Sequence, residues 1–329
     1  MSNNKRVIIT GGSGFIGTNL VSSYLERNWD VKNFDILPPR NSDHLTKWVK
    51  TDLLDRADLI KKTKEFRPSV FLHFGARTDL NEKDNLAGYA SNIEGVCNVI
   101  DAIRAASSIK RVVFASSQLV CYLGYRPKNE YDYRPTTLYG ISKVLTERII
   151  RSADDIGAVW TIVRPTSLYG PWFDVPYKNF FLTISKNYYI HPGEIQIYKQ
   201  WGFVGNSVYQ IEKLVDAPKD KVHKKMFYLA DFKPILFTDF ANLVQRSLSA
   251  APIRTINPNL LKIMAQIGDL LQHMGWKQPP LTTFRYHNII TSELQNLKPL
   301  QRLVGSLPYS PEQAVAQTVN WMRQMEMLN

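Results

Sequence analysis

The amino-acid sequence predicts an α/β protein in which a doubly wound parallel sheet is followed by a smaller mixed α/β domain. Short apolar runs alternate with helical patterns through the first half of the chain, as in βαβ units. The central runs VVFAS, VFLHF and TIVRP hardly alternate polar with apolar residues, which is typical of strands buried on both faces. After Gly170 and Pro171 the regular alternation stops, and aromatic residues and prolines become dense.

The patterns place the elements of the first half in order. Strands are expected where β-rich runs end at turn residues, at 6–10, 30–36, 48–53, 70–74, 111–116 and 158–164. Helices are expected where apolar residues recur at helical spacing, at 15–27, 85–106 and 139–153. We therefore predict a sheet domain over residues 1–170 and a smaller domain mainly over 171–329, with some of the later chain returning to the sheet.

One segment of the second half has a clear helical pattern. Over residues 259–274 the apolar side chains fall on one stripe, which consists of Leu260, Ile263, Met264, Ile267, Leu271 and Met274. The stripe fits either a helix packed in the core or a helix lying on a membrane surface. Because the polar side carries few lysines, core packing is the favoured interpretation.

Length and composition exclude several classes of protein. The 329 residues suggest about two domains, and 44% hydrophobic with 21% charged residues excludes a disordered or fibrous chain. No apolar run reaches the roughly 18 residues of a membrane span, and MSNNKRVIIT fits a first strand better than a signal peptide. Two cysteines, Cys97 and Cys121, are too few for a disulfide scaffold or a cysteine metal cluster. We therefore expect a cytoplasmic protein without a metal.

The net charge of +12 is large for a chain of this length. Such a charge predicts acidic partners, which include nucleic acid, an anionic membrane surface and phosphorylated small molecules. Because no nucleic-acid-binding motif accompanies the charge, we expect a small-molecule partner and no nucleic acid.

The strongest motif lies where the first strand ends. In Thr10-Gly11-Gly12-Ser13-Gly14-Phe15-Ile16-Gly17, three glycines recur at a spacing of three just before a helix. Such a turn lets the backbone and the helix N-terminus approach a pyrophosphate. Asp35 ends the second strand 18 residues after Gly17, where a carboxylate accepts hydrogen bonds from the adenosine ribose and repels a 2′-phosphate. The motif predicts a Rossmann-type domain that prefers NAD to NADP, although Arg40 lies nearby.

A second motif pairs Tyr139 with Lys143, four residues later on one face of a predicted helix. An ammonium about 4 Å from a phenolate stabilises it by roughly 4 kcal/mol at an effective dielectric constant of about 20, and desolvation opposes this effect. The pair therefore predicts a lowered pKa for Tyr139, which would act as an acid and base. Ser116 and Ser117 end the fifth strand, at the edge where ligands bind in parallel sheets.

These motifs together resemble the extended short-chain dehydrogenase/reductases, and more narrowly the NAD-dependent epimerase/dehydratase group that acts on nucleotide sugars. The segments that carry the resemblance are TGGSGFIG at 10–17, Asp52-Leu53, HFGAR at 73–77, NIEG at 92–95, Ser117, the Tyr139–Lys143 pair and RPTSLYGP at 164–171. The cofactor contacts that it implies are Gly11, Gly14, Phe15, Ile16, Gly17, Asp35, Asp52, Leu53, Phe74, Gly75, Ala76, Arg77, Asn92, Tyr139, Lys143 and Pro165.

The resemblance also implies catalytic roles and an assembly. Tyr139 would move the proton while a hydride moves at C4 of the nicotinamide, Lys143 would hold the nicotinamide ribose, and Ser117 would orient the reacting hydroxyl or ketone. Family members commonly dimerise through two long helices, which here would be 85–106 and 139–153. The resemblance therefore implies a homodimer.

Several positions depart from the pattern of the family. Gln118-Leu119 replaces the Asp-Glu pair of the 4,6-dehydratases, so dehydration is not expected. Ser167 replaces a common Asn, and Trp201 replaces a common diphosphate-binding Arg, for which Lys199 would compensate. Cys121 replaces a common Tyr and is interpreted as packing rather than redox chemistry. The implied substrate contacts are Ser117, Gln118, Ser167, Asn179, Lys199 and Arg285, although Arg285 fits a structural role better.

Three functions remain open on the sequence. The favoured one is an NAD-dependent epimerase of a nucleotide-diphosphate sugar that passes through a transient ketone. The alternative is an NAD(P)-dependent dehydrogenase or ketoreductase of the same fold, acting on a nucleotide sugar or on a hydrophobic hydroxy compound such as a sterol. The aromatic segment 172–181 and the replaced diphosphate Arg favour this alternative. A non-catalytic cofactor-binding subunit is less favoured because Ser117, Tyr139 and Lys143 are all present.

Overall fold

A computed structural model describes residues 5–328 except 81, 83, 154, 175, 176, 194, 277, 278 and 280. Parallel strands form a seven-stranded sheet in the order β11–β6–β5–β4–β1–β2–β3. The strands are β1 (Arg6–Thr10), β2 (Asp30–Asp35), β3 (Trp48–Lys50), β4 (Val70–His73), β5 (Arg111–Ala115), β6 (Val159–Pro165) and β11 (Lys225–Leu229). The predicted fold class is confirmed.

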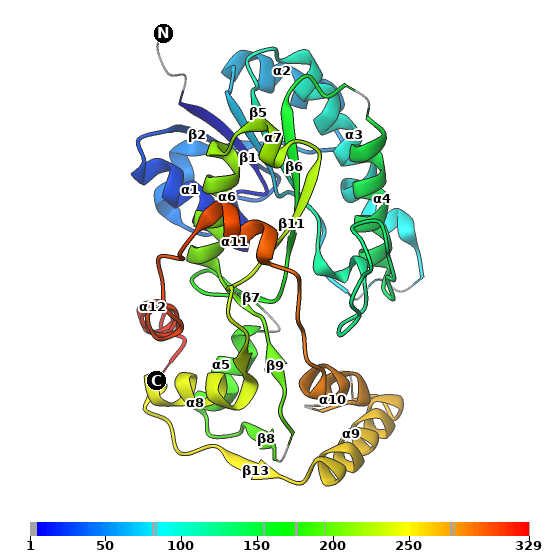
Figure 1. Ribbon diagram of the computed structural model, residues 1–329, viewed down its shortest axis with the longest axis vertical. Helices are drawn as coiled ribbons and strands as arrows, with labels where there is room; N and C mark the ends of the chain where they lie inside the picture. The colour runs from blue at the N-terminus through cyan, green and yellow to red at the C-terminus, as the bar shows by residue number, and fades with distance from the viewer. Residues whose placement is uncertain are drawn as a thin grey trace.

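Helices cover both faces of the sheet (Figure 1). One face carries α1 (Phe15–Glu26), α6 (Val204–Asp216) and α11 (Lys298–Val304). The other face carries α2 (Arg56–Phe66), α3 (Ala90–Ala105) and α4 (Leu138–Ser152). Short 3-10 turns lie at η1 (Ser42–Lys47), η2 (Leu86–Tyr89) and η3 (Gln118–Val120), so the predicted helix 85–106 begins as such a turn.

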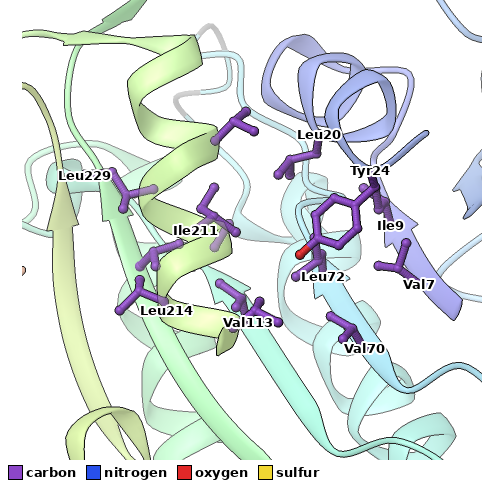
Figure 2. Close-up of a cluster of buried hydrophobic side chains, with 14 of the residues drawn as sticks. Val7, Ile9, Leu20, Tyr24, Val70, Leu72, Val113, Ile211, Leu214 and Leu229 are labelled. Carbon is purple, nitrogen blue, oxygen red and sulfur yellow. The ribbon is translucent and has the colours of Figure 1, made fainter. Parts of the chain in front are cut away.

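The core on the first face joins segments that are far apart in the chain. Val7 and Ile9 of β1 and Leu20 of α1 pack in one cluster with Ile211 of α6 and Leu229 of β11 (Figure 2). Leu300 and Val304 of α11 belong to the same cluster. The later chain therefore returns to the sheet and completes its core.

A smaller lobe lies beyond the carboxyl ends of the strands (Figure 1). Short strand pairs build it: β7 (Leu168–Tyr169) with β10 (Gly202–Phe203), β9 (Tyr198–Lys199) with β12 (Ile235–Leu236), and β8 (Ile190–Pro192) with β13 (Arg254–Ile256). Its helices are α5 (Tyr177–Ser185), α8 (Phe237–Leu248), α9 (Pro258–His273), α10 (Thr283–Ile290) and α12 (Pro311–Gln324), while α7 (Lys219–Val222) precedes β11.

Helix α9 differs from its prediction. Its buried side consists of Leu261, Ala265 and Gly268, and a side chain on Gly268 would place its Cβ 1.7 Å from the carbonyl oxygen of Leu281. This close approach turns a different face of the helix inward from the predicted one. Ile263 and Met274 of the predicted stripe are therefore exposed, and the expectation that the stripe packs in the core is wrong.

The predicted homodimer stays a prediction. Helices α3 and α4, which would form its interface, lie side by side on one face of the sheet (Figure 1). In the part of the chain that the structure describes, no helix is long and apolar enough to span a bilayer.

Candidate active site

The turn between β1 and α1 has the close backbone packing of a phosphate cradle. Gly11 has a φ of +69°, and a Cβ there would lie 2.6 Å from the backbone nitrogen of Gly75. A Cβ on Gly17 would lie 1.9 Å from the carbonyl oxygen of Gly11. Only glycine fits either position. Gly14 is the N-cap of α1, and no side chain caps the backbone N–H groups of the first turn of this helix. The chain therefore fits the pyrophosphate of a dinucleotide at this turn.

Asp35 lies beside this cradle at the end of β2. Its carboxylate accepts hydrogen bonds from the backbone N–H of Ser13 at 3.1 Å and of Leu37 at 3.0 Å. The carboxylate is therefore fixed next to the turn, as recognition of an adenosine ribose requires. Arg40 is held elsewhere, because its guanidinium donates to the carbonyl oxygen of Trp172 at 2.9 Å and lies 3.8 Å from Asp174.

The segment after β4 is held by Asn92 of α3. The side chain of Asn92 accepts from the N–H of Arg77 at 2.8 Å and donates to the carbonyl of Arg77 at 3.0 Å. Asn92 is buried, so it positions the segment 74–77, which follows the strand end. The guanidinium of Arg77 pairs with Asp79 at 2.6 Å and lies over the ring of Tyr89.

The remaining predicted cofactor positions lie along the same edge of the sheet. Leu53 is buried, and its side chain packs so closely on Gly75 that a Cβ on Gly75 would lie 2.9 Å from it. The Asp52 carboxylate is exposed and accepts a hydrogen bond from the backbone N–H of Leu54. The other positions follow strand ends or begin α1, and they are Phe15, Ile16, Phe74, Ala76 and Pro165.

Ser117, Tyr139 and Lys143 come together at the end of β5. Ser117 caps η3, and Thr137 caps α4, on which Tyr139 and Lys143 lie one turn apart. The Ser117 side chain lies close enough to the Tyr139 phenol to lower its pKa. The Lys143 ammonium donates to the carbonyl of Ala115 at 2.9 Å and lies 6.0 Å from the centre of the Tyr139 ring. All three side chains are buried.

Burial dominates the electrostatics of this triad. Desolvation raises the pKa of Tyr139 to about 12, although the nearby Ser117 side chain lowers it in part. Desolvation also lowers the pKa of Lys143 to about 8 against the attraction of Glu147. The predicted lowering of the Tyr139 pKa is therefore wrong, because burial of the phenolate is the largest effect on this group. The phenol keeps its proton at neutral pH and is a proton donor.

A buried ion pair that the sequence did not indicate lies one turn beyond Lys143. Glu147 of α4 binds the guanidinium of Arg164 through two hydrogen bonds, at 2.7 and 2.8 Å, and both side chains are 0% exposed. Ser116 and Tyr133 donate to the same carboxylate at 2.6 and 2.9 Å. The pair ties α4 to β5 and β6, so it fixes the helix that carries Tyr139.

A second buried polar cluster lies on the substrate side of the triad, and we call it the Glu293 cluster. Gln118 donates to the Ser167 hydroxyl at 3.2 Å and to the Glu293 carboxylate at 3.4 Å. Tyr177 donates to Ser167 at 2.6 Å. The Lys199 ammonium donates to Glu293 at 2.7 Å and to the carbonyl oxygens of Asn288 and Thr291 at 2.8 Å each.

The cluster changes the expected role of Lys199. Its ammonium has three protein partners and is buried, so it does not replace the missing diphosphate-binding Arg. Trp201, at the position of that Arg, packs against the rings of Phe237 and Phe240. Sequence reasoning missed Glu293 and Tyr177, because no local pattern links either residue to Ser167 or Lys199.

The two other predicted substrate contacts lie outside this cluster. Asn179 is exposed on α5, two residues beyond Tyr177 and therefore on a different side of the helix. Arg285 is exposed on α10 and donates to the carbonyl of Pro279 at 2.7 Å. Cys121 is buried, and its thiol donates to the carbonyl of Asp132 at 3.3 Å, which fits a packing role.

Buried histidines near these sites predict a loss of stability in acid. His73 lies 2.8 Å from the Thr10 hydroxyl, and burial with the nearby Lys143 lowers its pKa to about 3. Burial lowers the pKa of His191 to about 4. Burial raises the pKa of the Asp231 carboxyl to about 6, an effect of opposite sign.

The sign follows from proton uptake. Below pH 6.5 both histidines are protonated in the unfolded chain and neutral in the folded chain, so the unfolded chain binds two more protons. Between pH 6 and 4, Asp231 is protonated in the folded chain and ionised in the unfolded chain, which offsets one of these two protons. We expect a net loss of about 1.4 kcal/mol per pH unit between pH 6 and 4 from these groups. Urea unfolding at several pH values measures it, and stability that rises toward pH 4 would contradict it.

The fold and this site define a dinucleotide-binding α/β protein with a tyrosine–lysine pair at the carboxyl ends of the strands. Residues 7–227 match the model of the NAD dependent epimerase/dehydratase family, and the chain belongs to this family. NAD is therefore the cofactor of this protein.

Individual relatives differ in activity. A protein of Methanocaldococcus jannaschii named as a candidate UDP-glucose 4-epimerase is 30% identical over 173 residues, which are 50% of this chain and 56% of the relative. The decarboxylating sterol-4-alpha-carboxylate 3-dehydrogenase of Saccharomyces cerevisiae is 24% identical over 98% of this chain and 99% of its own. The structure of a Thermotoga maritima UDP-glucose 4-epimerase with UDP-glucose has a TM-score of 0.73 at 18% identity, covering 98% of this chain and 99% of its own, which shows the shared fold.

Proposed function

We propose that the protein is an NAD-dependent dehydrogenase or ketoreductase that acts on a secondary alcohol, or the matching ketone, of a substrate with a large apolar body. The Glu293 cluster is the observation that carries the proposal. Lys199, the cation that would replace the diphosphate-binding Arg, is neutralised by Glu293 at 2.7 Å in a buried pair. Lys199 is therefore not free to hold a nucleotide diphosphate beside Gln118 and Ser167.

The triad has the groups that the reaction needs. NAD, when bound, supplies the hydride acceptor or donor. In the reduction, the Tyr139 phenol, whose pKa is raised to about 12, gives its proton to the ketone oxygen as that oxygen becomes a hydroxyl. In the oxidation, the deprotonated form of Tyr139 accepts the hydroxyl proton, so we expect the oxidation to be faster at alkaline pH. Ser117, whose side chain lies close to that phenol, orients the same oxygen. Lys143, whose pKa is lowered to about 8, keeps a charge at neutral pH and holds the cofactor ribose.

The extent of sequence similarity also supports the dehydrogenase. The yeast sterol dehydrogenase aligns with 98% of this chain and thus with the smaller lobe, whereas the archaeal epimerase-like relative aligns with 50%. The smaller lobe supplies Tyr177, Lys199 and Glu293, so similarity there bears on the substrate.

An epimerase of a nucleotide-diphosphate sugar is the second candidate. The 30% identity to the archaeal relative favours it, as does the complete triad, because both reactions begin with oxidation of a secondary alcohol. The two differ afterwards: a dehydrogenase releases the ketone and reduced cofactor, whereas an epimerase reduces the ketone again from its other face.

The test compares two substrate panels with the purified protein. With added NAD, a panel of 3β-hydroxysteroids is expected to yield NADH, followed by its ultraviolet absorbance. UDP is expected to show no binding by calorimetry up to about 1 mM. Interconversion of UDP-sugars without net NADH, or micromolar binding of UDP, would reject the dehydrogenase in favour of the epimerase.

Glu293→Gln provides a matched variant for the same test. The substitution keeps the shape of the side chain and leaves the Lys199 ammonium without its anion. UDP is therefore expected to bind this variant more tightly than the wild type. Equal UDP affinity in both proteins would show that the ion pair does not exclude a diphosphate.

A further inference from the structure

The outer face of α9 is an unpartnered apolar surface, and we call it the α9 face. It consists of residues at helical spacing that are between 41% and 75% exposed: Leu260, Ile263, Met264, Ile267, Leu270 and Met274. Side chains of this size, about half exposed, present on the order of 600 Å² together, which is the upper end for the largest patch of a soluble monomer. None of the residues that the structure describes covers this face.

The α9 face lies at the outer end of the smaller lobe, with α10 beside it (Figure 1). Trp276, just after the helix, is 51% exposed, and Phe284 of α10 is 64% exposed. Lys262 and His273 are exposed on the polar side of the helix. An exposed apolar stripe with a tryptophan at its end is a feature of helices that lie in a membrane interface.

The charge around the helix favours an anionic partner. The described residues of 250–292 include three cations, Arg254, Lys262 and Arg285, and one acidic residue, Asp269, within a chain of net charge +12. The Asp269 carboxylate already accepts from the N–H of Thr283 at 3.1 Å. A second copy of the chain would bring the same excess of positive charge against itself, which opposes pairing.

We propose that the α9 face docks the protein on an anionic lipid bilayer. The helix would lie in the plane of the interface with its apolar face among the headgroups and acyl chains, and nearby cations would face anionic lipids. This contact is peripheral, and it does not depend on the proposed function.

Docking would bring the membrane close to the substrate side of the pocket. Thr283 of α10 is hydrogen-bonded to Asp269 of α9, and Asn288 and Thr291 at the other end of α10 bind Lys199 through their carbonyl oxygens. Both α9 and α10 therefore lie between the α9 face and the Glu293 cluster. A substrate with a large apolar body would reach the lobe that carries this cluster from the bilayer.

The test is co-sedimentation with vesicles of about three parts phosphatidylcholine to one part phosphatidylglycerol. Ile263→Glu is the test variant and Leu45→Glu is its control, because both residues are 52% exposed and both changes add one negative charge. Leu45 lies in η1 of the sheet domain. We expect the wild type and the control to bind alike, and Ile263→Glu to bind at least about tenfold more weakly.

Added salt is expected to weaken the binding of the wild type, since anionic lipids contribute to it. Three results would overturn the proposal: no binding of the wild type, equal binding of the wild type and Ile263→Glu, or loss of binding in both variants. Light scattering after gel filtration tests whether a second copy of the chain covers the α9 face instead. A dimer that Ile263→Glu converts to a monomer, without vesicle binding by the wild type, would assign the face to a second copy.

Discussion

Replacing Tyr139 by phenylalanine is expected to lower turnover by about 10²–10⁴-fold, because the variant lacks the proton that the phenol exchanges with the substrate oxygen. The affinity for NAD is expected to stay unchanged, since the phenylalanine ring fills the same buried space and the cradle at Gly11–Gly17 is untouched. Steady-state rates measure the first effect, and fluorescence titration with NADH measures the second.

Tyr125→Phe is the matched control for this variant. It removes the same hydroxyl from a tyrosine whose phenol donates to Asp132 at 2.8 Å and does not contact Ser117. We expect it to keep the wild-type rate. A Tyr139→Phe enzyme with full activity would remove Tyr139 from the chemistry and favour a cofactor-binding role for the protein.

Replacing Arg164 by methionine is expected to destabilise the protein by about 3–5 kcal/mol, the usual cost of leaving one charge of a buried ion pair without its partner. The Glu147 carboxylate would remain buried with the Ser116 and Tyr133 hydroxyls and with Arg151, whose guanidinium lies 3.8 Å away. Urea unfolding of the variant and the wild type measures the difference.

Two further variants separate the buried pair from a general effect of the substitution. Arg104→Met removes an exposed arginine 3.7 Å from Asp101 and is expected to cost less than about 1 kcal/mol. The double variant Glu147→Met/Arg164→Met is expected to recover much of the lost stability, because no buried charge is left alone. A double variant less stable than Arg164→Met would show that the polar network, rather than the ion pair, holds α4 in place.

Local patterns predicted the central sheet well. The strands β1, β2, β4, β5 and β6 agree with their predicted ranges to within one or two residues, and all of them except β2 are short apolar runs. Helix α2 was not predicted, since only Leu59 and Thr63 of its residues are buried and its apolar pattern is therefore weak. Strand β11 was not predicted individually because it follows the excursion into the smaller lobe.

The candidate site also has a part that local patterns predicted and a part that they did not. The cradle, Asp35 and the Ser117–Tyr139–Lys143 triad could be predicted, because strand ends of one parallel sheet meet at one edge. The Glu293 cluster could not be predicted, because Lys199 and Glu293 are 94 residues apart and meet through tertiary packing alone. The direction of the Tyr139 pKa depended on complete burial, which spacing on a helix does not reveal.

The return of the later chain to the sheet determines how much of the chain must be synthesised before the sheet domain can complete its fold. β11 pairs with β6, and Leu300 and Val304 of α11 close the core around Val7 and Ile9. On the ribosome, the cofactor turn is synthesised first, yet the outer edge of β6 stays unpaired until β11 has been made. The core around Val7 and Ile9 is complete only once α11 has been made as well. A fragment that ends near residue 170 would hold the glycine motif and the triad but lack half of the layer that keeps them in place.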